Sequence, residues 1–362
     1  TALRNVWETV GALEKDSEFV DSDSFYTSIT GDCRVTLWKD LERTEKELLS
    51  LSPEDETEIR KFAEHVRYAA KCEIPAEKPM DAMGIMDYIH MGASMADMSK
   101  VMREYGSIDL QEMAGRFRHP ALRALFTDYL PKEYTASSFL VSYGSIVSGN
   151  GEIPKGGSLA MVNHMVKRFQ ELGGKLYCNT PVSRIVIRNK KAVGIETADQ
   201  KEVTADYVIS SVDTMEMFSK LIGKEYIDSK LQSCYADSEK YPLFSAVQAA
   251  FVVDTEAYDE KGTIFFDCPS FETGGKKSDR ISVKSYEYET DFAPAGKTVL
   301  QVNVPQFDRE YFYWKGLTKA EYKRQKEAAV SAIEERLLRQ FPKLRGHMEF
   351  LDCWTPLTYE QY

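Results

Sequence analysis

The sequence of 362 residues lacks the common signatures of nucleotide binding and of hydrolytic catalysis. It contains no G-x-G-x-x-G fingerprint, no G-x-x-x-x-G-K-[ST] loop and no G-x-S-x-G nucleophile elbow. The nearest match to the first pattern, Gly149-Asn150-Gly151, has no third glycine. The residues alone therefore identify neither a familiar phosphate-binding loop nor a nucleophilic serine.

Cysteine pairs, histidine clusters, basic patches and long apolar runs are also missing. The six cysteines include no C-x-x-C pair and the five histidines are scattered, which favours a reducing, cytoplasmic compartment without a metal site. A net charge of −11 argues against binding to nucleic acid. No apolar run approaches the length of about 20 residues that crosses a bilayer, although peripheral membrane contact stays open.

The region from residue 80 to 130 is expected to be helical and is rich in methionine. Spacings of four, three and four residues put four methionines on one face of one helix, namely Met91, Met95, Met98 and Met102. Methionine fills irregular gaps in protein cores. The face therefore belongs either to the core or to the wall of a pocket for a long hydrophobic ligand.

Residues 154 to 213 show a different pattern. A helix is expected from about Ser158 to Leu172, ending at Gly173-Gly174. Four short strands should follow, with the sequences KLYC, VSRIVIR, AVGIET and ADYVISS. Gly156-Gly157 runs directly into this helix, and a glycine-rich helix start offers backbone N–H groups to an anion. The question is whether these glycines bind a phosphate.

The later part of the chain predicts a mostly antiparallel sheet covered by helices. Its strands are LFSAVQAAFVV, GTIFFD, RISVKSYEYE and KTVLQVNVPQ. A long helix then starts at the capping box Thr318-x-x-Glu321, and Pro342 ends it. Together these patterns predict an α/β (α+β) protein with a mixed or antiparallel sheet and helical layers.

The stretch from residue 153 to 213 resembles the phytoene desaturase group of flavin-dependent oxidoreductases, which are relatives of the amine oxidases. The resemblance rests on Pro154, Gly156-Gly157, Gly173-Gly174, Val182 to Ile185, Val193-Gly194-Ile195 and Ala205 to Ile209. The segments LRNVWETVGALEK and FPKLRGHMEFLDCWTPLTYEQY resemble the family as well.

The resemblance implies an incomplete Rossmann-like FAD-binding domain joined to a substrate domain. By this comparison, residues 1–150 and 223–345 form the substrate domain, residues 151–222 part of the FAD domain, and residues 346–362 return towards it. The family's dinucleotide fingerprint would precede Thr1, and its last flavin contact would follow Tyr362. We therefore expect a central portion of a flavoenzyme that does not hold FAD by itself.

The resemblance also implies roles for individual residues. Gly156 and Gly157 start a helix that packs beside the flavin domain, with direct cofactor contact as the alternative. The backbone of Val182 would meet the adenine. Ser210 and Ser211 would pass near the nucleotide, unless they are ordinary serines at a strand end. No catalytic residue is implied.

Two functions remain open from the sequence. The first is FAD-dependent dehydrogenation or desaturation of a hydrophobic substrate, isoprenoid or carotenoid-like, with the methionine helices and the later sheet as the substrate tunnel. The second is a non-catalytic module that binds a hydrophobic ligand or a partner protein. The flavin would carry the difficult chemistry of the first function.

Overall fold

The computed structural model describes residues 2–20, 22–72, 78–238 and 240–361 and divides the chain into two compact units. The first unit contains residues 1–168 and 245–362, and the second contains residues 169–244. The sequence placed domain boundaries near residues 151 and 223 instead. Each unit is described by itself, and the functional assignment of the segments stays a prediction.

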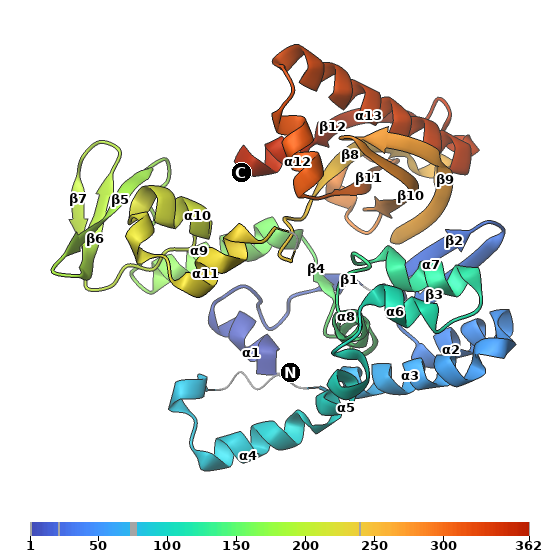
Figure 1. The fold of residues 1–362 in the computed structure, drawn as a ribbon, viewed down its shortest axis with the longest axis horizontal. Helices are drawn as coiled ribbons and strands as arrows, with labels where there is room; N and C mark the ends of the chain where they lie inside the picture. The colour runs from blue at the N-terminus through green and yellow to red at the C-terminus, as the bar shows by residue number, and fades with distance from the viewer. Residues whose placement is uncertain (1, 21, 73–77, 239, 362) are drawn as a thin grey trace. The chain divides into compact units, whose positions relative to one another are not determined.

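A seven-stranded mixed sheet dominates the first unit (Figure 1). Its neighbouring strands are antiparallel except for the parallel pair β2 and β9. In spatial order the strands are β12 (Met348–Trp354), β8 (Ser245–Asp254), β11 (Lys297–Gln306), β10 (Lys276–Ser285), β9 (Thr263–Thr273), β2 (Ser24–Thr30) and β3 (Cys33–Trp38). The expected mixed sheet with helical layers is thereby confirmed.

One face of this sheet is buried beneath α13 (Lys319–Gln340), as Figure 1 shows. Alternate residues of β11 are buried, including Leu300, Val302 and Val304, because successive side chains of a strand point to opposite faces. They pack with Ile333 and Leu337 of α13 in one hydrophobic core. The predicted capping box is present, since Thr318 and Glu321 cap α13 reciprocally.

A second core lies between the β2–β3 end of the sheet and a helical layer. Fully buried aromatic side chains dominate it, among them Tyr26, Phe62, Phe126, Phe139 and Tyr143. The helices of this layer are α2 (Leu41–Leu51), α3 (Glu56–Ala70), α5 (Ala96–Tyr105), α6 (Leu110–Gly115), α7 (Pro120–Asp128) and α8 (Ala136–Val147).

The remaining elements of the first unit are shorter, apart from one helix that continues into the second unit. They are α1 (Ala2–Thr9), β1 (Phe19–Val20), α4 (Ile85–Ser94), β4 (Ile153–Pro154), α12 (Asp308–Lys315) and α14 (Pro356–Gln361). Strand β1 pairs with β4 in an antiparallel ladder. The continuing helix is α9 (Gly157–Glu171), which ends before Gly173-Gly174 as expected.

The second unit contains a three-stranded antiparallel sheet of β5 (Val182–Arg188), β6 (Lys191–Thr197) and β7 (Glu202–Thr204), with α10 (Thr214–Glu216) and α11 (Ser229–Ala236). Two strand predictions are wrong here. KLYC and ADYVISS form no strand: the N–H of Ala205 donates to the carbonyl of Val193 in β6 at 3.0 Å, but no ladder follows it among the described residues. Their apolar side chains are accordingly exposed, with Tyr207 at 87% and Ile209 at 93%.

Candidate functional site

The lead-in to α9 is a turn that requires glycine. Gly156 and Gly157 have φ angles of 82° and 64°, in the left-handed region that other residues rarely adopt. A Cβ atom on Gly156 would also lie 2.8 Å from the Cβ of Ala160. The two glycines therefore let the chain pass from the β1–β4 ladder directly into the helix.

A carboxylate of the protein occupies the anion position at this turn. The backbone N–H of Gly156 donates to Oε1 of Glu289 at 2.9 Å. Gly157 lies beside the ring of Phe292, in the short 3₁₀ turn Thr290–Phe292. These contacts are packing contacts within the first unit. Whether either glycine also contacts a cofactor stays a prediction.

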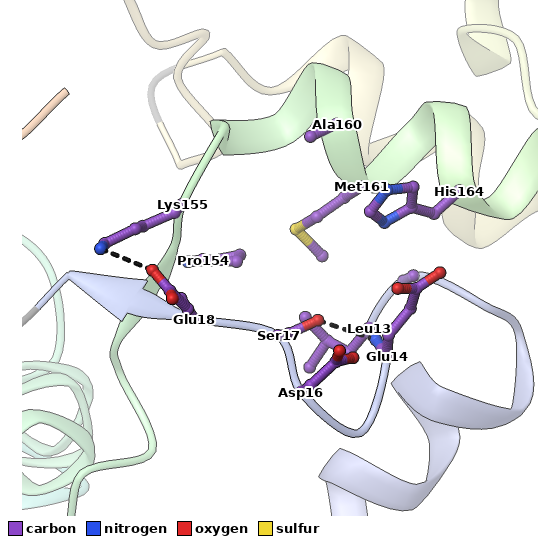
Figure 2. A pocket seen from close by; sticks show the side chains of 11 residues that line it. Leu13, Glu14, Asp16, Ser17, Glu18, Pro154, Lys155, Ala160, Met161 and His164 are labelled. Atoms are coloured by element: carbon purple, nitrogen blue, oxygen red, sulfur yellow. Dashed lines mark hydrogen bonds and ion pairs between the residues drawn. The ribbon is translucent and has the colours of Figure 1, made fainter. Parts of the chain in front are cut away.

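A small cavity of about 190 Å³ lies beside this turn, between the loop that follows α1 and the first turns of α9 (Figure 2). The side chains of Glu14, Asp16 and Glu18 come from the loop, and His164 comes from the helix. Nζ of Lys155 is paired with Glu18 at 2.7 Å, and this hydrogen bond lowers the pKa of Glu18. The acidic lining disfavours a phosphate, since like charges repel.

The sheet face opposite α13 carries polar side chains in register on β10, β11 and β8. Lys284 of β10 lies opposite Gln301 of β11, and Ser282 lies opposite Asn303. Gln248 of β8 continues the row beyond Asn303. All five side chains are half-buried. This row, which we call the amide row, differs from the opposite, apolar face of the same strands.

Two tyrosines, Tyr286 and Tyr288, follow Lys284 just beyond the end of β10. Its Nζ lies 4.8 Å from the ring centroid of Tyr286 and 5.8 Å from that of Tyr288. The hydroxyl of Tyr286 donates to Oε1 of Gln301 at 2.6 Å. Burial lowers the pKa of Lys284 and raises that of Tyr288 to about 12. Glu289, one residue further along the chain, is the group that meets Gly156.

From the sequence, the segment RISVKSYEYE was predicted only as a strand, although the spacing of its lysine and tyrosines indicates a cation–π cluster. In K-x-Y-x-Y the period of two places Lys284, Tyr286 and Tyr288 on one side of an extended chain. A lysine followed by two aromatic residues on one strand face is a pattern from which a cation–π arrangement follows.

Three of the predicted cofactor residues, Val182, Ser210 and Ser211, lie in the second unit. Val182 begins β5, and its side chain is 37% exposed. Ser211 is exposed, whereas Oγ of Ser210 is buried and has no hydrogen-bond partner among the described residues. A buried hydroxyl without a partner is costly, so Ser210 fits a ligand contact in the second unit.

The sequence contains no glycine-rich loop that would bind the pyrophosphate of a dinucleotide. The residues present therefore fit only the nucleotide part of such a cofactor. The glycine-rich helix start at Gly156-Gly157 is the one that Glu289 contacts. The predicted roles of Val182, Ser210 and Ser211 remain untested.

The prediction that four methionines share one helix is wrong. The helix breaks at Met95, which has φ −90° and ψ 2° and joins α4 to α5. Met91 lies in α4, whereas Met98 packs against the aromatic core and Met102 is 49% exposed. Spacing by itself does not reveal such a break. The proposed role of these residues in a substrate tunnel stays a prediction.

The described residues hold neither a metal-binding cluster nor a membrane-spanning helix. No group of three or more His, Cys, Asp or Glu side chains is arranged to hold a metal ion within residues 2–20, 22–72, 78–238 and 240–361. In the same ranges, no helix is both long and apolar enough to cross a membrane.

The mixed sheet with its helical layers is also the fold of a solved oxidoreductase. The oxidoreductase from Methanosarcina mazei superimposes with a TM-score of 0.56 at 16% identity, over 98% of this chain and 72% of that one. The family described as flavin containing amine oxidoreductase matches residues 42–336. The chain therefore belongs to this family.

Curated relatives include proteins of carotenoid and retinoid metabolism. Phytoene desaturase (lycopene-forming) of Paracoccus sp. is 23% identical over 61% of this chain and 45% of its own length. Prolycopene isomerase of Daucus carota is 22% identical over 59% and 35%, respectively. All-trans-retinol 13,14-reductase of Danio rerio is 26% identical over 64% and 42%. The chain thus spans less than half the length of these relatives.

Proposed function

We propose that this chain is the substrate-binding part of an FAD-dependent oxidoreductase that acts on a hydrophobic, isoprenoid or carotenoid-like substrate. The observation that carries the proposal is the family match over residues 42–336, together with relatives that act on carotenoids and retinol by name. When bound, FAD would accept or donate a hydride. The chain's own residues would orient the substrate and exclude water.

We also propose that the 362-residue chain alone does not retain FAD. The support is chemical: no glycine-rich phosphate loop is present in the sequence, and Glu289 meets the glycine-rich helix start at Gly156. Val182 and Ser210 would supply only contacts near the nucleotide. Since the pyrophosphate contacts supply much of dinucleotide recognition, these remaining contacts are too few for tight binding.

The test compares the product of the complete gene with this chain after gel filtration. A flavin absorption spectrum and the mass of FAD in the complete product, with neither in the chain, would support both proposals. A yellow 362-residue chain would contradict the second. No flavin in either protein would favour the alternative of a non-catalytic module that binds a hydrophobic ligand or a partner protein.

A peripheral membrane contact through α4 is proposed for the same protein. Ile85, Met86 and Ile89 of this helix are 82%, 62% and 56% exposed, which is typical of interfacial helices. Because the chain is acidic, neutral phosphatidylcholine vesicles are the appropriate surface. The double variant Ile85→Asp/Ile89→Asp should lose flotation with these vesicles. Leu159→Asp, at another exposed apolar position, is the control.

A further inference from the structure

Lys284 is a half-buried cation on the face of the sheet that carries the amide row. It forms no ion pair among the described residues, although Glu287 is near enough to act on it electrostatically. Two tyrosine rings cover one side of it, at 4.8 Å and 5.8 Å from Nζ. A half-buried cation is costly to leave unpaired, which makes the position suited to an anionic ligand.

Hydrogen-bonding groups adjoin the lysine on the same sheet face. Gln301 lies directly across from Lys284, at the separation of a cross-strand pair. Its Oε1 accepts from Tyr286, so its amide nitrogen is the group left to donate to a ligand. Further along the amide row, Oδ1 of Asn303 is buried and has no hydrogen-bond partner among the described residues. The row therefore offers polar capacity that the protein does not use.

The other end of this face is apolar. Val299 lies opposite Tyr286 and also pairs with Val252 of β8. Ala250 lies between Val252 and Gln248 along β8, opposite Gln301. These three aliphatic side chains are half-buried on the face that also carries the amide row. The face thus changes from amide and ammonium groups to aliphatic side chains within a few residues of each strand.

We propose that Lys284, with the amide of Gln301, binds the carboxylate of an amphipathic substrate whose apolar chain lies over Val299, Val252 and Ala250. This inference rests on the proposed function and names the substrate class for it: a long-chain or polyene carboxylate. A hydrocarbon would strip water from the lysine without replacing it. A diphosphate would need several cations, whereas Glu287 and Glu289 follow Lys284 closely in the chain.

The test measures binding by the 362-residue chain, with cis-parinaric acid and its methyl ester as fluorescent polyene probes. The two probes differ in the charge of one end. Because a hydrogen bond to a charged group exceeds a neutral one, the acid should bind about tenfold more tightly than the ester. Lys284→Met should remove this preference by weakening the acid, leaving the affinity for the ester within about twofold.

Lys276→Met is the matched control variant. Lys276 lies on the same strand, is likewise half-buried and faces an aromatic ring, that of Phe307, at 4.9 Å. Its Nζ, however, donates to the carbonyl oxygen of Pro305 at 3.0 Å. The control should keep the full preference for the acid. Lys284→Arg, which retains the charge, should keep most of it. Lys284→Gln, which is neutral, replaces Lys284→Met if that variant does not fold.

Several results would overturn the proposal. They are equal affinity for acid and ester, a preference that survives Lys284→Met, an equal loss in Lys276→Met, or no binding of either probe by the folded chain. No flavin is needed for the measurement. Failure to find FAD in the complete gene product would thus refute the proposed function while leaving the result for Lys284 standing.

Discussion

The ion pair between Asp128 and Arg280 joins the helical layer to the sheet. Asp128 ends α7, and its carboxylate accepts from Nε and Nη2 of Arg280 at 2.8 Å each. It also accepts from the hydroxyl of Ser28 in β2 at 2.7 Å. The side chains of the pair are 4% and 22% exposed, respectively. Arg280 further contacts Asp267 and Thr30.

Asp128→Ala should therefore destabilise the first unit strongly. Removing one partner of a buried pair costs about 3–5 kcal/mol, because the other charge loses its compensation. Since Arg280 keeps Asp267, we expect a loss near the lower limit, about 3 kcal/mol. The assay is urea denaturation followed by far-UV circular dichroism, with the free energy of unfolding compared between the variant and the parent chain.

The control is a bidentate pair that is more exposed. Arg34 and Glu260 pair at 2.6 Å and 2.8 Å, with side-chain exposures of 47% and 24%. Glu260→Ala should cost no more than about 1 kcal/mol, as is usual for exposed pairs. The double variant Asp128→Leu/Arg280→Met should be less destabilised than Asp128→Ala. A loss for Asp128→Ala no larger than that of the control would refute this reasoning.

Three further predictions concern other sites. Burial opposes ionisation of Asp55, but hydrogen bonds from the backbone N–H groups of Arg118 and His119 outweigh burial and hold the pKa of Asp55 below its ordinary value. The ionised carboxylate therefore stabilises the fold at neutral pH, and this contribution is lost as the pH falls and the carboxylate is protonated. In urea titrations from pH 6 to pH 2, the free energy of unfolding should consequently fall less steeply for Asp55→Asn than for the parent chain. Gly194→Ala should cost about 1–3 kcal/mol by thermal melting, because a Cβ would overlap the carbonyl of Val203; an unchanged melting curve would contradict this. Trp314→Phe should cost about 1–3 kcal/mol in denaturation, since Oε1 of the buried Gln306 loses its 3.1 Å donor.

Sequence periodicity predicted the large sheet well because its strands bury one face. The boundaries of β11 coincide with the predicted KTVLQVNVPQ, whose alternate residues face the core. KLYC and ADYVISS have comparable composition yet form no strand. A strand requires a partner for its N–H and C=O groups, and a local pattern does not specify that partner.

The candidate site was less predictable because it depends on long-range contacts. The glycine pair correctly indicated a helix start, but the carboxylate that meets it comes from Glu289, 133 residues further along the chain. Similarly, the period of the methionines does not show that the helix breaks at Met95. The local sequence K-x-Y-x-Y already places Lys284 beside two tyrosines. That Gln301 lies opposite Lys284 is known only from the register of β10 and β11.

The amide row should function independently of the ion pair on the same strand. Arg280 and Lys284 are four residues apart on β10, a separation of about 13 Å along an extended strand. The register of Lys284 is set by its antiparallel pairing with Gln301 in β11, whereas Arg280 binds the β2 side of the sheet. Asp128→Ala should thus lower the stability of the folded chain but preserve the tenfold preference for parinaric acid over its ester. Loss of that preference in folded Asp128→Ala would show that the ion pair, and not the strand register alone, positions Lys284.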